Sequence, residues 1–196
     1  SKSTILAVFF QAWVWITRPQ TSFLVTSYKE SLALRDSVAC RTLLRSGWYR
    51  ERWGDRFSLS GDMNIKSRFE NNKGGYRVTA AVGGATGEGA DVLICDDLHS
   101  RTEELSSTRA QIDVAKNYFN MEFSSCLSDP QNSCIVVSGQ RVSLDDVSAD
   151  ILAKGGWEHL KIRQEYIPPP PGEEKPRTSI GWSDPRTEAG ELMWPV

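Results

Sequence analysis

Two adjacent carboxylates, Asp96 and Asp97, end a short apolar run and are the pair in this sequence best suited to do chemistry. The run before them, from Val92 to Cys95, is bounded by turn residues, which predicts a buried strand of a parallel sheet. Ligands bind beyond the carboxyl ends of such strands, where two acids can hold a metal ion and orient a water molecule. The alternative is a buried strand that ends in a solvated acidic turn.

A second polar group, from Ser1 to Thr4, lies directly before an apolar pattern with helical spacing. Both faces of this pattern are apolar, which predicts a helix over 1–17 that is buried nearly all round. Lys-Ser-Thr at such a helix start matches the end of a Walker A loop, where the lysine and the helix N-terminus hold phosphates. The glycine-rich part of that loop is missing, so the alternative is an ordinary helix start with Ser3 or Thr4 as N-cap.

The rest of the chain predicts the elements that must position these residues, and their alternation is typical of an α/β fold. We expect helices at 28–45, 100–125 and 145–153. We expect strands at 22–27, 57–59, 65–70, 76–82, 133–138 and 157–166. A turn at 71–75 joins two of the strands into a hairpin. In the helix at 28–45 we expect Leu32, Ala39 and Leu43 on the buried stripe, with Gly47 as the stop.

A third polar group, Gly139-Gln140-Arg141, follows the predicted strand at 133–138. If that strand is parallel to the one that ends at Asp96, both groups lie at the same edge of the sheet. His99 follows the acidic pair and fits two roles, a ligand or base, or a polar residue beside a helix cap formed by Ser100 and Glu103.

The composition is that of a globular protein, with 39% hydrophobic and 24% charged residues among 196. A formal net charge of -2 means that any nucleic-acid contact needs a local basic patch. The four cysteines lack CxxC spacing and are predicted to be reduced core thiols. The apolar run at 4–16 is too short for a membrane span and lacks the features of a signal peptide.

One stretch interleaves aromatic residues with Arg50, Arg52 and Arg56. Such interleaving can indicate contact with nucleic acid. The alternative is a satellite aromatic cluster that is covered by the aliphatic stems of the arginines.

Several short motifs in this order resemble the large terminase subunit of tailed bacteriophages. They are Lys2-Ser3-Thr4, Ser27-Tyr28 with Leu32–Ser37, Gly87–Asp91, Asp96–His99, Gln140-Arg141, and Gly181–Arg186 with Gly190–Pro195. The resemblance covers essentially the whole chain. It implies an ASCE-type P-loop NTPase fold, a three-layer sandwich with a mainly parallel sheet, plus a short β-hairpin excursion.

In that family an ATPase ring pumps double-stranded DNA into a procapsid. The resemblance therefore implies ATP and Mg²⁺ as cofactors. It implies DNA, the portal protein, the small terminase subunit and further copies of the chain as partners, with no membrane, in the cytoplasm of an infected bacterial host. We expect residues 1–167 to be the ATPase domain without its N-terminal start, and 168–196 to be a Pro-rich linker towards an absent nuclease domain. The resemblance therefore implies that this chain hydrolyses ATP and does not cleave DNA.

The resemblance also implies roles for single residues. Ser1 to Thr4 would bind the nucleotide, with Lys2 as the Walker A lysine and Ser3 as a metal ligand beside Asp96. Asp97 stands where the family often has a glutamate that orients the attacking water, and it is one methylene shorter. Gln140 and Arg141 match the motif that senses the γ-phosphate, although Val142-Ser143 follow where a histidine is usual.

The resemblance does not assign an arginine finger, which some terminases carry where this chain has Thr86. Arg77, Arg101 and Arg141 are the candidates. Two other functions remain open from the sequence. One is a helicase-like or other RecA-like DNA-dependent ATPase, against which the Gly-Glu-Gly loop and the Trp-Ser-Asp-Pro-Arg tail count. The other is a non-catalytic interaction domain that keeps the α/β fold.

Overall fold

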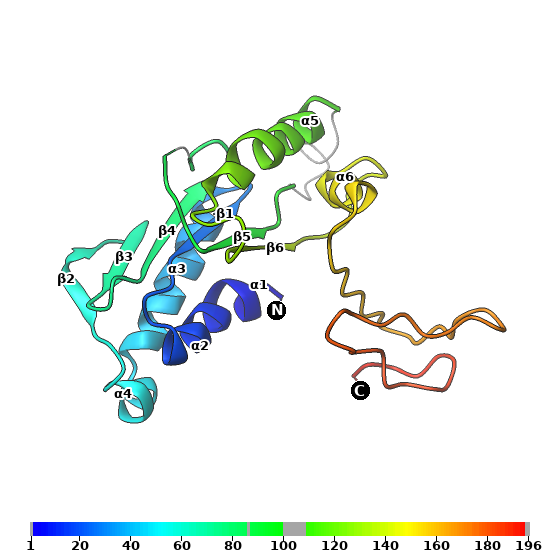
Figure 1. Cartoon of the computed structure of the whole chain (residues 1–196), viewed down its shortest axis with the longest axis horizontal. Helices are drawn as coiled ribbons and strands as arrows, with labels where there is room; N and C mark the ends of the chain where they lie inside the picture. The colour runs from blue at the N-terminus through cyan, green and yellow to red at the C-terminus, as the bar shows by residue number, and fades with distance from the viewer. Residues whose placement is uncertain (1, 86, 100–108, 195–196) are drawn as a thin grey trace. The chain divides into compact units, whose positions relative to one another are not determined.

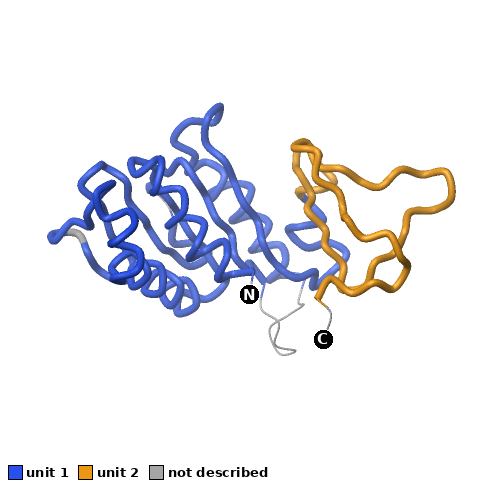
Figure 2. Tube along the Cα trace, turned by 90° about the horizontal axis from the view of Figure 1, so that it is seen from below, with its two compact units in different colours: residues 1–150 blue, residues 151–196 orange. Residues whose placement is uncertain are grey.

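The computed structural model describes residues 2–85, 87–99 and 109–194, which form two compact units, Ser1–Asp150 and Ile151–Val196 (Figure 2). The strands of the first unit are β1 Phe23–Ser27, β2 Leu59–Asn64, β3 Arg68–Asn71, β4 Tyr76–Ala81, β5 Val92–Asp96 and β6 Cys134–Ser138. They form one sheet in the order β2-β3-β4-β1-β5-β6, and β4, β1, β5 and β6 are parallel (Figure 1). The predicted α/β class, the mainly parallel sheet and the β3–β4 hairpin are confirmed.

The helices are α1 Lys2–Thr4, η1 Ile5–Phe9, α2 Phe10–Thr17, α3 Glu30–Arg45, α4 Gly47–Trp53, α5 Arg109–Asn117, η2 Tyr118–Phe123, η3 Ser124–Cys126 and α6 Val147–Lys154. The first three are one continuous helix that widens to a π-helix over η1. This helix and α3 pack on one face of the sheet, where they meet β1, β4 and β5. On the other face the Tyr118 hydroxyl lies 3.3 Å from Thr26 Oγ1 of β1. Helices thus cover both faces of the parallel strands (Figure 1).

The core on the first face is built around Trp15, which is fully buried. Its ring packs edge-on against Phe23, Phe57 and Phe69 at centroid distances of 6.4, 5.3 and 5.9 Å. The indole Nε1 donates to the carbonyl oxygen of Thr21 at 2.8 Å, so the one polar atom of this side chain is satisfied. The core therefore fixes the first helix firmly against the sheet.

The first helix differs from the prediction because its outer face is exposed. Ile5, Phe9 and Trp13 are 60%, 51% and 66% exposed. Only the face that carries Ala7 and Trp15 packs on the sheet and on α3. Within the described residues nothing covers the opposite face. Apolar side chains on a helix face are therefore not sufficient to predict that this face is buried.

The stripe predicted for α3 was also wrong. The buried residues of this helix are Ala33, Asp36, Ser37, Cys40 and Leu44. These are mostly small, which lets the helix backbone lie close to β1, β4 and η1. Gly47 does not simply stop the helix either: Ser46 accepts a hydrogen bond from the N–H of Tyr49 at 3.2 Å and starts α4 at Gly47.

Two further expectations need correction. Strand β6 is the last strand of the sheet and Cys134 is exposed there, whereas Cys40, Cys95 and Cys126 are buried as predicted, and all four thiols are free. The alternating segment 157–166 forms no strand and makes a single β-bridge, from Glu165 to Leu192. No helix in the described ranges is both long and apolar enough to cross a bilayer.

The second unit is organised around the buried side chain of Arg186. Its guanidinium donates to three backbone carbonyl oxygens, those of Arg163, Gln164 and Glu191, at 2.9–3.0 Å. It also forms a bidentate pair with the carboxylate of Asp184 at 3.0 and 2.7 Å. Polar contacts with one arginine thus replace a regular ladder of strands in this unit.

Candidate functional site

Three segments that are distant in the sequence meet at the carboxyl edge of the parallel strands. Asp96 lies opposite Ser138 in the register of β5 and β6. The N–H of Asp97 donates to the carbonyl oxygen of Ser138 at 2.8 Å, so the pairing continues past the end of β5. The N–H of Tyr28 donates to the carbonyl oxygen of Asp97 at 2.9 Å, which brings in the end of β1. The predicted alignment of these polar strand ends is confirmed.

Lys2 reaches the same edge from the start of the first helix. Its Nζ donates to the carbonyl oxygen of Gly139 at 3.0 Å, and the two residues are 137 positions apart. The lysine is exposed, so its ammonium remains accessible from solvent at this edge. The helix start predicted to hold phosphate and the polar end of β6 are therefore neighbours in space.

Asp96 is the buried acid of the site, with 7% of its surface exposed. Burial raises the pKa of its carboxyl, and the negative charge of Asp97 adds to this. Hydrogen bonds from the hydroxyls of Ser3 and Ser138 act in the opposite direction because they stabilise the carboxylate. The Ser3 hydroxyl is therefore close enough to Asp96 to lower the pKa of its carboxyl.

The donor set of Ser3 and Asp96 fits Mg²⁺. This ion takes oxygen ligands, keeps several waters, and is usually held by only one or two protein groups together with substrate phosphates. Among the residues that the structure describes, no group of three or more His, Cys, Asp or Glu side chains is arranged to hold a metal ion. A soft or fully protein-ligated metal centre therefore has no candidate in those ranges, whereas a magnesium–phosphate site needs no such cluster.

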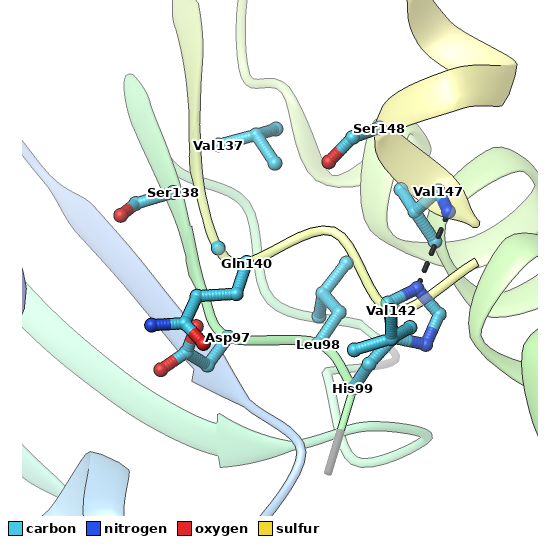
Figure 3. Close-up of a pocket in the computed structure, with 10 residues that line it drawn as sticks. Asp97, Leu98, His99, Val137, Ser138, Gln140, Val142, Val147 and Ser148 are labelled. Atoms are coloured by element: carbon cyan, nitrogen blue, oxygen red, sulfur yellow. Dashed lines mark hydrogen bonds between the residues drawn. The ribbon is translucent and has the colours of Figure 1, made fainter. Parts of the chain in front are cut away.

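Asp97 has an unusual backbone conformation. Its φ of +50° is the one positive value among the described residues other than glycine. Aspartate tolerates the left-handed region better than most residues because its short side chain can bond locally. A Cβ built on Gly139 would lie 3.7 Å from Oδ1 of Asp97, an ordinary van der Waals distance, so the start of the loop after β6 packs close to this carboxylate. Gln140 and Asp97 line the same small pocket at this edge (Figure 3).

The side chain of Arg141 makes a structural contact. Its Nε and the carboxylate of Asp146 are 3.0 Å apart, and Asp146 is completely buried. Burial alone would raise the pKa of Asp146, but hydrogen bonds from the backbone N–H groups of Ala149, Val142 and Ser143 and from Arg141 lower it. Asp146 thus fastens the loop after β6 to the start of α6. Gln140 lines the pocket beside Asp97, whereas Arg141 is not among the residues that line it.

Arg77 is wrong as a candidate arginine finger. It is fully buried on β4, and its Nη1 donates to the carbonyl oxygen of Ala7 at 2.6 Å and to Gln11 Oε1 at 3.0 Å. Burial lowers the pKa of this arginine. The other expectations placed at Ser1, Thr86, Arg101 and the Ser100–Glu103 cap lie outside the described residues.

His99 makes a structural contact with the start of α6, whereas the predicted helix cap beside it lies outside the described residues. Its Nε2 accepts a hydrogen bond from the N–H of Val147, the first residue of α6, at 3.2 Å (Figure 3). Burial lowers the pKa of the imidazole, which favours the neutral form that this bond requires. The histidine thus joins the loop after β5 to α6.

Sequence reasoning missed a charged pair of α3, Arg35 and Asp36, that lies near the site. The two side chains bond at 2.9 and 3.2 Å. The neighbouring Asp36 is the main cause that raises the pKa of Arg35, and Asp96 raises it further. The guanidinium therefore lies within electrostatic range of Asp96. Asp36 is buried, whereas the side chain of Arg35 is 61% exposed. The available signal was the position of α3, which begins shortly after the carboxyl end of β1.

The pocket at this edge is small, about 10 Å³, which is room for a single water-sized group. Its lining includes Asp97, His99, Ser138, Gly139 and Gln140. Comparison with protein families finds none that matches the chain, and comparison with curated proteins finds no match. The functional conclusion therefore depends on the sequence and on the geometry of this edge.

Proposed function

We propose that the chain is an ATP-hydrolysing motor domain of the kind found in the large terminase subunit of tailed bacteriophages, which drives double-stranded DNA into a procapsid. The observation that carries the proposal is the meeting of Lys2, Ser3 and Asp96. The lysine lies at the carbonyl of Gly139, and the serine hydroxyl bonds the buried aspartate. A lysine, a hydroxyl and an acid in this arrangement are the parts that P-loop NTPases use around a nucleotide.

Each residue has a role that its surroundings allow. The Lys2 ammonium would exchange the Gly139 carbonyl for phosphate oxygens, and the hydroxyl of Ser3 and the carboxylate of Asp96 would hold Mg²⁺. When bound, the ion neutralises charge that develops on the phosphates. Asp97, which the left-handed turn carries past the end of β5, would orient the attacking water.

Two further side chains would act on the phosphate end of the substrate. Gln140 lines the same pocket as Asp97 and can donate its amide N–H to a phosphate oxygen or to the water (Figure 3). Arg35 is largely exposed and within electrostatic range of Asp96, so its guanidinium can approach a phosphate while it stays paired with the buried carboxylate of Asp36. Arg141 would act indirectly, because its contact with Asp146 holds the loop that presents Gln140.

Substitution of Asp96 tests the proposal. We expect Asp96→Asn to lower ATP hydrolysis by about 100-fold or more, since the neutral amide is a poor partner for a metal-bound nucleotide. Hydrolysis is measured as phosphate release, with and without duplex DNA. The Mg²⁺ dependence of binding of a fluorescent ATP analogue provides a second measurement, which we expect to be lost in the variant.

Asp113→Ala is the matched control, because it removes a half-exposed carboxylate on α5 that pairs with Arg109 at the surface. We expect its hydrolysis to equal that of the wild type. Circular dichroism of both variants checks that the fold is kept. Unchanged turnover in a folded Asp96→Asn protein would refute the assignment of Asp96, and absence of Mg-dependent nucleotide binding by the wild type would refute the function.

A further inference from the structure

A groove lies between the end of α3, α4 and the edge strand β2. Its volume is about 450 Å³, far larger than the pocket at the carboxyl edge. The residues that line it are Leu44, Arg45, Tyr49, Arg50, Gly54, Phe57, Ser58, Leu59, Ser60, Gly61 and Asn64. We call it the basic groove, since its two charged residues are arginines and no acidic residue lines it.

The two arginines of the basic groove differ from their neighbours in having no competing partner. Neither Arg45 nor Arg50 forms an ion pair or a side-chain hydrogen bond with another described residue, and both are exposed. By contrast, Arg52 lies over the ring of Trp48 at 4.8 Å and donates to its carbonyl oxygen at 2.8 Å. Arg56 lies 3.8 Å from the carboxylate of Asp55. Of the three arginines that the sequence singled out, Arg50 alone lines the groove.

The other lining residues favour a phosphate ligand over a stacked base. Ser60 and Asn64 lie on the edge strand and Ser58 lies just before it, and the side chain of Asn64 is bonded to Arg41 and to the Ser60 carbonyl oxygen. The two aromatic residues, Tyr49 and Phe57, are 3% and 7% exposed, and the Tyr49 hydroxyl is already bonded to the Ala12 carbonyl oxygen at 2.7 Å. Proteins that bind single strands stack bases on exposed aromatic rings, and the groove offers none. Arginines on a polar floor match the phosphates of a duplex instead.

We infer that the basic groove binds the sugar–phosphate backbone of duplex DNA through Arg45 and Arg50. The choice of DNA as the phosphate source rests on the proposed function. The groove lies far from the nucleotide edge, because α3 begins near the end of β1 and its 16 residues carry the chain to Arg45. At 1.5 Å per residue the helix separates the two sites by about 24 Å. The same helix carries Asp36 near Asp96 and Arg45 in the groove.

Equilibrium binding of the full chain to a short fluorescein-labelled DNA duplex tests the inference. We expect Arg45→Ala/Arg50→Ala to weaken binding by about tenfold or more at moderate salt. The slope of log K against log salt should fall by about 2, since each phosphate contact contributes about one. Both residues are exposed, so their removal leaves the core intact.

Arg52→Ala/Arg56→Ala is the matched control, because it removes the same charge from the same segment outside the groove. We expect it to weaken binding by less than about threefold. An equal loss in the two double variants would overturn the inference, since binding would then follow diffuse surface charge. Displacement of the duplex by millimolar inorganic phosphate, or tighter binding of a single strand of the same length, would also overturn it.

The outcome is separable from that of the proposed function. The Asp96→Asn protein should keep duplex binding, because the groove does not use the nucleotide edge. If duplex binding depends on Arg45 and Arg50 but the chain does not hydrolyse ATP, the groove assignment stands and the motor function is refuted. If ATP hydrolysis depends on Asp96 but the groove variant binds duplex DNA as the wild type does, the ATPase function stands and the groove assignment is refuted.

Discussion

Asp96 and Asp97 are adjacent in the sequence, but their surroundings differ. Asp96 is the last residue of β5, buried and bonded by two serine hydroxyls, which suits an acid that stays in place to hold a metal ion. Asp97 lies in a left-handed turn and is half-buried, with Gly139 close to its carboxylate. The left-handed turn also suits an aspartate, because its short side chain tolerates this conformation better than most others.

Arg77 shows how a residue type suggests one role and burial decides another. Its guanidinium bonds the Ala7 carbonyl, which lies in the π-helical segment η1, and the side chain of Gln11. Its Nη2 and the Nε2 of Gln11 have no hydrogen-bond partner among the described residues. The arginine therefore links β4 to the helix that carries Lys2 and Ser3, at the cost of a buried charge that is incompletely paired.

We predict that Arg77→Ala lowers the free energy of unfolding by about 3 kcal/mol, because it leaves a cavity and an unpaired Ala7 carbonyl. Arg77→Met keeps most of the volume and removes the buried charge, so we expect a loss of about 1 kcal/mol or less. Urea unfolding followed by circular dichroism measures both. Equal losses in the two variants would contradict the assigned cause, and so would full stability of Arg77→Ala.

At the scale of elements, the contacts of α6 hold the loop that carries Gln140. Asp146 bonds three backbone N–H groups and Arg141, and His99 accepts the N–H of Val147. These contacts join the segment after β5, the segment after β6 and the start of α6. Helix α6 thus supports the site through its first turn rather than by supplying a residue to it.

The His99 contact predicts a pH dependence of stability. Because burial lowers the pKa of His99 in the folded state, folding favours the neutral imidazole, although Asp146 partly opposes this. The contribution is fully present above the unfolded pKa of about 6.5, and it is lost as the pH falls through the lower folded value. We therefore expect the thermal midpoint of the wild type to fall between about pH 7 and 5.

His99→Gln should remove most of this pH dependence, because glutamine can accept the Val147 N–H but does not titrate. His159→Gln is the control, since His159 is exposed. Thermal unfolding across the same pH range compares the three proteins. A His99→Gln protein that loses stability with acid as steeply as the wild type would exclude His99 as the source.

At the scale of the whole molecule, the first unit has two distinct chemical surfaces. The carboxyl edge of the sheet gathers Lys2, Ser3, Asp96, Asp97 and Gln140, and the opposite end of α3 carries the basic groove. A net charge of -2 gives no sign of the groove, because the average over the chain hides a local pair of arginines. The second unit is held together differently, by polar contacts around the buried side chain of Arg186.

Arg186→Ala should therefore unfold the second unit and leave the first intact. The variant removes the donor for three backbone carbonyls and the partner of Asp184, which no regular secondary structure replaces. We expect proteolytic cleavage within 157–194 to become about tenfold faster or more, since cleavage follows the population of the open form. Arg177→Ala is the control, because Arg177 is exposed and donates one long bond to the Gly181 carbonyl oxygen at 3.5 Å. Equal protection of Arg186→Ala and wild type would contradict the assignment.

The local signals in the sequence were sufficient for the elements around the polar strand ends, but they missed α4 and placed β2 at 57–59 instead of Leu59–Asn64. Apolar runs and turn residues act over a few neighbours, so β1, β5, β6, the β3–β4 hairpin and α6 lie where periodicity and turn chemistry predict them. The same local signals identified Asp96, Asp97 and Gln140 as side chains at the ends of strands. They failed at 157–166, where an alternating pattern finds no sheet to join, and where Arg186 takes the carbonyls of Arg163 and Gln164.

Only the tertiary structure decided which of these residues meet. The contact of Lys2 with Gly139 spans 137 positions, and nothing local to either residue contains it. The buried face of α3, the burial of Arg77 and the approach of Arg35 to Asp96 likewise depend on how layers pack. The sequence by itself determined that an acidic pair ends a buried strand. Packing determined that Ser3 and Lys2 lie beside that strand end, because parallel strands align their ends at one edge and the first helix is held against them.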